Sequence, residues 1–178
     1  MEAFYRTHSY LVEHTHAPIR RGLMDEIDWR DRMIGIKGTR GVGKTTFLLQ
    51  YAKEKFGTDR SCLYINMNNF YFSQYSLVDF AGEFVKRGGK VLLIDQVFKY
   101  QQWSKDLREC YDRYPELKIV FTGSSVMRLK EENEELSGIV KVYYLRGLSF
   151  REFLNLQSGM NFRPYTLDEI LKDHETIA

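Results

Sequence analysis

The chain has 178 residues, a formal net charge of +2 and 43% hydrophobic residues. These totals are typical of one globular domain whose core is large enough to fold alone. The small net charge gives no indication of a nucleic-acid partner, and no apolar run approaches the roughly 18 residues of a membrane span. The stretch 1–20 lacks a signal-peptide pattern, and Cys62 and Cys110 match no metal spacing. We therefore expect a cytoplasmic protein with reduced, buried thiols and no membrane partner.

The N-terminal segment 1–32 predicts two short helices before the first strand. The first helix is favoured by the apolar residues Phe4, Tyr5, Leu11 and Val12. Pro18 ends it. The second helix is expected over 20–28, where apolar residues recur on one side.

A glycine-rich stretch follows the first expected strand, 33–37, and opens a helix expected over 44–55. It reads GTRGVGKTT and matches the phosphate-binding pattern G-x-x-x-x-G-K-[ST]. Strand, loop and helix in this order are the setting of a P-loop, whose backbone N–H groups face phosphate. The residues predicted to bind ATP are Gly38, Thr39, Arg40, Gly41, Val42, Gly43, Lys44, Thr45 and Thr46.

Within this loop, two side chains have separate predicted roles. Lys44 would neutralise the β- and γ-phosphates, and the Thr45 hydroxyl would ligate Mg²⁺. In P-loop proteins the segment before the first strand often lies against the base. The stretch 18–21 is a weak candidate for that contact, and simple packing is the favoured interpretation.

The remaining pattern alternates strands and helices and predicts an α/β fold. Continuous apolar runs predict buried strands at 62–67, 90–95, 118–122 and 140–145. Helical stripes predict helices between 77 and 87 and between 103 and 114. An aromatic stretch at 70–75 lacks interleaved basic residues, so we expect it to pack in the core or at an interface rather than against bases.

The third expected strand reads KVLLID and ends at Asp95. Four apolar residues followed by an acid form the Walker B pattern, which delivers a carboxylate beside the P-loop to hold Mg²⁺ through water. Related ATPases usually have Glu next, as the base and orienter of the attacking water. Here the residue is Gln96, whose amide can hold water but cannot accept its proton. Hydrolysis is therefore expected to be impaired, in either a natural binding-only ATPase or a protein deliberately altered to trap ATP, and the otherwise intact site favours alteration.

A polar residue at the end of the fourth expected strand would lie between the P-loop and the Walker B acid. Ser124 is the candidate sensor of the γ-phosphate, with Ser125 and Thr122 behind it. A small polar turn with no contact to nucleotide is the competing interpretation.

The C-terminal part predicts a helix over 148–157, started by a capping box at Ser149 and Glu152. A second box at Thr166 and Glu169 starts another helix, which reaches the end of the chain without a stop signal. We expect residues 1–160 to form the P-loop ATPase domain, with 33–145 as its sheet core, and 161–178 to begin a truncated helical lid or linker.

Together these motifs resemble those of bacterial AAA-superfamily ATPases, of the type found in Bacteroidetes and their relatives. The matching pieces include IGIKGTRGVGKTTFLLQ, GGKVLLIDQVFKYQQW and YLRGLSFREFL, and they cover most of residues 18–157. The resemblance implies a three-layer P-loop fold of five mainly parallel strands in the order 5-1-4-3-2. It also implies Glu at the position of Gln96, which supports an altered residue. The family often has His at the position of Phe98 and two arginines near 138–139, so an arginine contribution from that loop is in doubt.

The leading hypothesis is an ATPase that couples Mg·ATP binding and hydrolysis to conformational change, with Lys44, Gln96 and Ser124 in the catalytic roles and Thr45 and Asp95 at the metal. A nucleotide-gated assembly module with little turnover is the alternative. A small-molecule or nucleoside kinase is a third class, although nothing in the chain marks an acceptor pocket. The resemblance implies an uncharacterised C-terminal domain and leaves open self-association and a protein or DNA partner of that domain.

Overall fold

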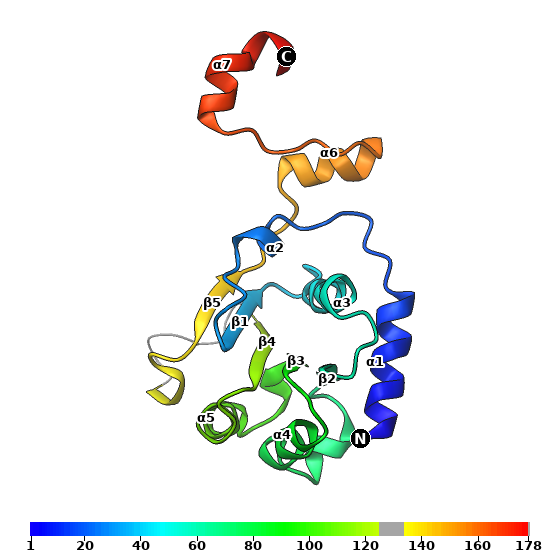
Figure 1. Ribbon diagram of the computed structural model, residues 1–178, viewed down its shortest axis with the longest axis vertical. Helices are drawn as coiled ribbons and strands as arrows, with labels where there is room; N and C mark the ends of the chain where they lie inside the picture. Colours follow the sequence, from blue (N-terminus) through cyan, green and yellow to red (C-terminus); the bar gives the residue numbers. More distant parts are fainter. Residues whose placement is uncertain (125–133, 178) are drawn as a thin grey trace.

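The computed structural model describes residues 1–124 and 134–177, with side chains described up to residue 172. Five strands alternate with helices along the chain (Figure 1). The strands are β1 (Met33–Gly38), β2 (Cys62–Asn66), β3 (Val91–Asp95), β4 (Lys118–Ser124) and β5 (Lys141–Tyr144). The helices are α1 (Glu2–His14), α2 (Leu23–Glu26), α3 (Lys44–Lys55), α4 (Leu77–Lys86), α5 (Trp103–Arg113), α6 (Phe150–Ser158) and α7 (Leu167–Ile177), and three short 3₁₀ turns cover Phe70–Ser73, Val97–Lys99 and Glu134–Leu136.

All four strand pairings are parallel, and the sheet order is β2-β3-β4-β1-β5. This order is the expected 5-1-4-3-2 read from the other edge, so the predicted α/β P-loop architecture is confirmed. β4, which ends at Ser124, lies at the centre of the sheet. β1, which leads into the P-loop, lies on one side of it, and β3 lies on the other. The carboxyl ends of all these strands meet at one edge of the sheet, where ligands bind in such folds.

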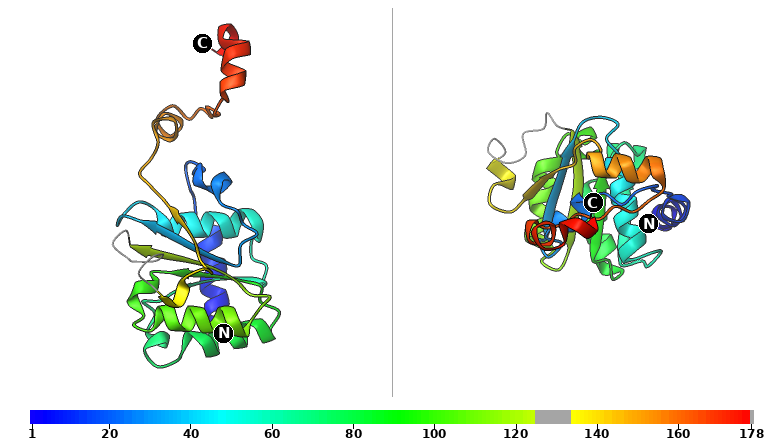
Figure 2. Two further views of the ribbon diagram at one scale, coloured as in Figure 1. Left: turned by 90° about the vertical axis from the view of Figure 1, so that its left-hand side faces the viewer. Right: turned by 90° about the horizontal axis from the view of Figure 1, so that it is seen from above.

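The two faces of the sheet are covered by different helices (Figures 1 and 2). Alternate side chains of each strand point to opposite faces. Leu92 and Ile94 of β3 pack in one core cluster with residues of α4 and α5, and Leu93 packs in the other with Phe47 and Leu48 of α3. The resulting helix–sheet–helix arrangement is the expected three-layer sandwich, with α1 lying along the β2 edge against both β2 and α3.

Several element boundaries differ from the sequence-based expectation. The second N-terminal helix is one turn, Leu23–Glu26, rather than 20–28. Arg20 and Arg21 lie before its N-cap, Gly22, and their side chains bond to Glu54 and Glu152. In the aromatic stretch, Phe72 is buried as expected, whereas Phe70 is 76% exposed.

The α6 and α7 helices extend away from the sheet (Figure 2). Both expected capping boxes are present: Ser149 and Glu152 cap α6, and Thr166 and Glu169 exchange the same pair of bonds before α7. No side chain of α6 is buried. Among the described residues, no helix has the length and apolar character needed to cross a membrane.

Candidate functional site

The P-loop joins the end of β1 to the start of α3, at the carboxyl edge of the sheet. Gly43 is the N-cap of α3 and has φ 94°, a left-handed conformation that glycine adopts without strain. Gly38 closes the strand, and a Cβ there would come within 2.6 Å of the Leu145 carbonyl oxygen, so only glycine lets the loop pass the end of β5. Thr39 and Thr45 are exposed, which leaves the loop open to a ligand.

The Lys44 ammonium folds back over the loop. Its Nζ donates to the carbonyl oxygens of Gly38 and Thr39, both at 2.8 Å. Burial lowers the pKa of Lys44, and the nearby Asp95 carboxylate partly opposes that effect. The cation is thus already held across the space that the loop encloses, where it can neutralise a phosphate.

Asp95 is the acidic centre of the site. It ends β3, and its side chain is nearly fully buried, at 1% exposure. Its Oδ2 accepts hydrogen bonds from the Thr45 hydroxyl at 2.7 Å, from the Tyr64 hydroxyl at 2.9 Å and from the Asn66 amide at 3.4 Å. The structure therefore brings the two predicted metal-side residues, Thr45 and Asp95, into direct contact.

Strand register explains why these groups converge. Asn66 pairs with Asp95 across β2 and β3, and Gly38 pairs with Ser124 across β1 and β4. Residues two positions apart on a strand share a face. Tyr64 and Asn66 thus lie on one face with Asp95 and with α3, which carries Thr45.

Gln96 follows Asp95 in a left-handed conformation, with φ 54° and ψ 44°. It is the one non-glycine residue with positive φ among the described residues. Such a conformation costs about 1–3 kcal/mol and persists where the surrounding structure enforces it. The Gln96 backbone N–H donates at 3.0 Å to both the Asp95 Oδ1 and the Thr122 hydroxyl, which in turn donates to Asp95 Oδ1.

Ser124 lies at the end of β4, opposite Gly38 at the start of the P-loop, and is half-buried. Its position beside the loop is the one that the sequence suggests for it. Ser125 falls outside the described residues. Thr122, which stood behind Ser124 in the sequence-based ranking, is fully buried and bonds to the Asp95 carboxylate instead.

The donor set suits magnesium and phosphate. Mg²⁺ prefers oxygen ligands and is commonly bound through one or two carboxylates together with substrate phosphates. Thr45 and Asp95 supply a hydroxyl and a carboxylate 2.7 Å apart, directly after the loop that carries Lys44. These residues would hold Mg²⁺ and the phosphates of ATP, and they fit both groups.

Sequence reasoning did not single out Tyr64 and Asn66 of β2, and it placed Thr122 of β4 behind Ser124. Tyr64 and Asn66 belong to an apolar run that the sequence marks only as a buried strand, and Thr122 is a small polar residue at a strand end. The common signal is positional: each lies near the carboxyl end of a parallel strand, on the face that carries α3.

Arg21 connects the segment before β1 with the P-loop and α6. Its guanidinium donates to the Val42 carbonyl at 3.2 Å, to the Arg146 carbonyl at 2.6 Å and to the Gly147 carbonyl at 3.2 Å, and its Nε pairs with Glu152 at 3.1 Å. The stretch 18–21 thus reaches the loop through one side chain.

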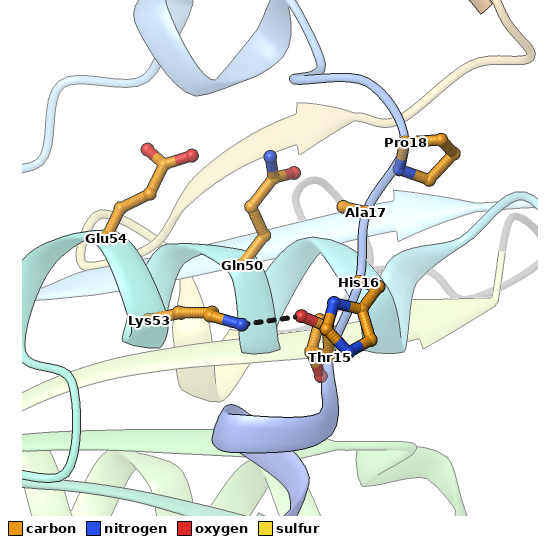
Figure 3. Close-up of a pocket in the computed structure, with 7 residues that line it drawn as sticks. All are labelled: Thr15, His16, Ala17, Pro18, Gln50, Lys53 and Glu54. Carbon is orange, nitrogen blue, oxygen red and sulfur yellow. Dashed lines mark hydrogen bonds between the residues drawn. The ribbon is translucent and has the colours of Figure 1, made fainter.

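Two cavities lie near this segment. One, of about 520 Å³, lies between the segment 15–18 and α3, and Lys53 donates to the Thr15 carbonyl at 2.8 Å on its wall (Figure 3). The other, of about 980 Å³, lies between the segment 20–26, the end of β5 and the segment from α6 to residue 164. Neither is lined by a residue of 38–46, but Arg21 lines the larger one and also bonds to Val42.

Comparison with known proteins identifies the family of the chain. Residues 30–154, more than half of the chain, match the profile of the AAA domain family. Among solved structures, the chain is similar to "Structure of C. elegans PCH-2", with TM-score 0.44, 17% identity, and coverage of 79% of this chain and 41% of that one. It is also similar to "Structure of Rhizobiales Trip13", with TM-score 0.43, 13% identity, and coverage of 82% and 59%. This chain therefore spans about two fifths and three fifths of those two proteins, and no curated protein matches it. With the family profile covering the P-loop, β3 and β4 together, the chain belongs to the AAA domain family.

Proposed function

We propose that the chain binds Mg·ATP at the P-loop and couples nucleotide binding to conformational change, with hydrolysis impaired at Gln96. The observation that carries this proposal is the hydrogen bond of 2.7 Å between Thr45 and Asp95. It joins the phosphate-binding loop to the acid at the end of β3, which is the pairing that an ATPase of this architecture uses.

Each residue then has a defined role. The backbone of 38–46 surrounds the phosphates, and Lys44 exchanges its bonds to Gly38 and Thr39 for bonds to phosphate oxygens. Thr45 and Asp95 hold Mg²⁺, which when bound neutralises charge on the phosphates. Ser124, facing Gly38 across β1 and β4, contacts the γ-phosphate.

Gln96 occupies the position of the water-activating residue. Its side-chain amide can orient a water molecule, but it has no basic atom to receive the proton. Its backbone N–H donates to Asp95 and Thr122. These bonds fix the Gln96 main chain beside the Asp95 carboxylate. In this proposal the site binds ATP and hydrolyses it slowly, so the nucleotide stays bound for a long time.

The larger cavity is the proposed place of the nucleoside. It adjoins the P-loop through Arg21, which bonds to Val42 on one side and lines the cavity on the other. Its volume of about 980 Å³ is at the upper end of the range usual for small-molecule sites.

Nucleotide titration of Lys44→Ala tests the binding part. Removing the loop's cation should weaken binding of a fluorescent ATP analogue in Mg²⁺ by about 30-fold or more, because charge-assisted bonds to phosphate are lost. Lys53→Ala is the matched control, since Lys53 lies on the same helix but donates to Glu13 and Thr15. Equal affinity of the two variants would contradict ATP binding at the P-loop.

Turnover of Gln96→Glu tests the hydrolysis part. Restoring a carboxylate at this position should raise the rate of phosphate release about 10²- to 10⁴-fold, the usual contribution of a general base. A rate unchanged from that of the parent chain would show that Gln96 is not the residue that limits hydrolysis.

A nucleotide-gated assembly module is the second candidate. It is favoured by exposed apolar side chains, with Phe150 at 75% and Phe70 at 76% exposure. Light scattering with ATP, with ADP and without nucleotide separates the two candidates. Assembly that depends on nucleotide, together with no turnover after Gln96→Glu, would favour the module.

A further inference from the structure

A chain of two hydrogen bonds leads from the N-terminal helix to the acidic centre of the site. His8 of α1 is 1% exposed, and its Nδ1 accepts from the Tyr64 backbone N–H at 3.0 Å. Tyr64 is 5% exposed, and its hydroxyl donates to Asp95 Oδ2 at 2.9 Å. One residue of β2 therefore contacts α1 through its main chain and the Walker B acid through its side chain.

The edge position of β2 gives the first bond its importance. β2 pairs only with β3, so alternate N–H groups of β2 point away from the sheet. The Tyr64 N–H is one of these, and a buried N–H without a partner costs free energy comparable to a lost hydrogen bond. His8 supplies the partner, and α1 thereby replaces a neighbouring strand at this point.

The protonation states of both side chains suit this arrangement. Burial lowers the pKa of His8, so its ring is neutral and Nδ1 is free to accept. The Nδ1 bond to the Tyr64 N–H is a buried polar contact between α1 and β2. The Tyr64 hydroxyl is the donor in its bond to Asp95, because a carboxylate only accepts.

We propose that Tyr64 is a positioning residue for Asp95 and that His8 couples the docking of α1 to it. This inference rests on the proposed Mg·ATP function. Asp95 Oδ2 accepts from Thr45 and Asn66 as well, but Asn66 is distant, at 3.4 Å, and Thr45 must also face the cation. The Tyr64 hydroxyl is thus the donor that holds Oδ2 independently of the nucleotide, while the Thr122 hydroxyl and the Gln96 N–H hold Oδ1. Donors that hydrogen-bond to a metal-binding carboxylate orient it toward the metal.

The consequence is that the attachment of α1 sets the affinity of the site for the divalent cation. When α1 is docked, the Tyr64 main chain is held from outside the sheet and its hydroxyl aims Asp95 at the cation. When His8 no longer accepts from Tyr64, the edge strand loosens and Asp95 Oδ2 loses the donor that directs it, while Oδ1 keeps its bonds to Thr122 and the Gln96 N–H. A partner that binds α1 would therefore act on magnesium binding without contacting the nucleotide.

Tyr64→Phe in the full chain tests the first step, because it removes one O–H and keeps the ring. The readouts are the affinity for a fluorescent ATP analogue without Mg²⁺ and the Mg²⁺ concentration that half-saturates the Mg²⁺-dependent increase in affinity. We expect the half-saturating Mg²⁺ concentration to rise about tenfold and the Mg²⁺-free affinity to stay the same. An unchanged Mg²⁺ midpoint, or equal weakening with and without Mg²⁺, would overturn the positioning role.

Substitutions of His8 test the second step. His8→Leu removes the acceptor and should raise the Mg²⁺ midpoint about threefold, in the range of coupling through packed networks. His8→Asn keeps an acceptor near the Nδ1 position and should restore the parent value. If His8→Leu does not fold, as judged by circular dichroism, His8→Gln replaces it, since its amide lies nearer the Nε2 position.

The double variant of His8→Leu and Tyr64→Phe completes the cycle. If both residues act along one path, the double variant should show the midpoint of Tyr64→Phe alone, whereas additive effects would overturn the coupling. The parent chain separates the two levels of inference. If it shows no Mg²⁺-dependent nucleotide binding, the proposed function fails and this inference with it. If it binds normally and Tyr64→Phe changes nothing, only this inference fails.

Discussion

Arg21 and Glu152 are 131 positions apart in the sequence, yet Arg21 Nε and Glu152 Oε1 pair at 3.1 Å with side chains only 12% and 13% exposed. The same Glu152 oxygen accepts from the Gly22 N–H at 2.9 Å, and the other oxygen accepts from the Ser149 N–H at 2.7 Å. Burial alone would raise the pKa of Glu152, but these N–H donors and Arg21 outweigh it and lower the pKa. The start of α6 is thus tied to the segment before β1.

Arg21→Ala should destabilise the fold and release α6. Four carbonyl and carboxylate partners lose their donor, and a charge-assisted hydrogen bond contributes about 1.5–3 kcal/mol. Urea unfolding and protease cleavage near 146–149 measure the effect. The matched control is Arg20→Ala, whose ion pairs with Asp25 and Glu54 are 43% exposed on the arginine side and contribute about 0–1 kcal/mol. Equal losses for the two arginines would contradict the role assigned to Arg21.

Thr122→Val should cost about 1–3 kcal/mol in the free energy of unfolding, because it leaves the Asp95 oxygen and the Gln96 N–H without a buried hydroxyl. Thr122→Ser keeps the hydroxyl and should lose less. Urea unfolding compares the two at one pH. A valine variant as stable as the serine variant would show that the hydroxyl is not needed to hold the strained turn at Gln96.

The stability of the chain should fall as the pH drops below about 6.5, the ordinary pKa of histidine. Burial lowers the pKa of His8 in the folded state. Between its folded and unfolded pKa values the unfolded chain binds the proton and the folded chain does not, so stability rises with pH in that window and is fully present above it. His8→Asn should flatten the dependence between pH 7.5 and the folded pKa, as followed by urea midpoints. The same slope in His8→Asn would assign the effect to other groups, and His14→Gln in the same helix serves as the comparison.

Cys62 and Cys110 should be unreactive in the folded protein. Both are free and fully buried, and burial raises the pKa of each thiol to about 12. Because the thiolate is the reactive form, modification by a thiol reagent at pH 8 should be about 10²-fold slower than in urea. Absorbance of the released chromophore follows the reaction. Fast modification of Cys62 or Cys110 without denaturant would contradict the burial of these thiols.

Much of the fold could be predicted from the sequence because its signals are local. The P-loop residues, the apolar run that ends at Asp95 and the box at Ser149 each specify a strand, a loop or a helix start without reference to the rest of the chain. The proximity of Thr45 and Asp95 also follows, since the carboxyl ends of the parallel strands β1 and β3 lie at one edge of the sheet.

The roles of Tyr64 and Arg21 could not be predicted from the sequence. The role of Tyr64 depends on the register between β2 and β3, and that of Arg21 depends on contacts between segments far apart in the sequence. Tyr64 is one aromatic residue in a buried strand, and it reaches Asp95 only because β2 pairs with β3 such that Asn66 lies opposite Asp95. Arg21 reads as a solvated charge before a short helix, and its carbonyl partners at 146 and 147 come from the other end of the domain. No local pattern encodes either partnership.

The left-handed backbone of Gln96 has a consequence for how the site can be altered. Glutamine and glutamate have the same side-chain length and the same Cβ, so both experience the same conformational penalty at φ 54°. The exchange of one for the other leaves this backbone penalty nearly constant and changes the charge of the terminal group and its capacity to accept a proton. The turn therefore fixes the main chain at a position where a side chain that accepts protons can replace one that does not, without a change in backbone strain.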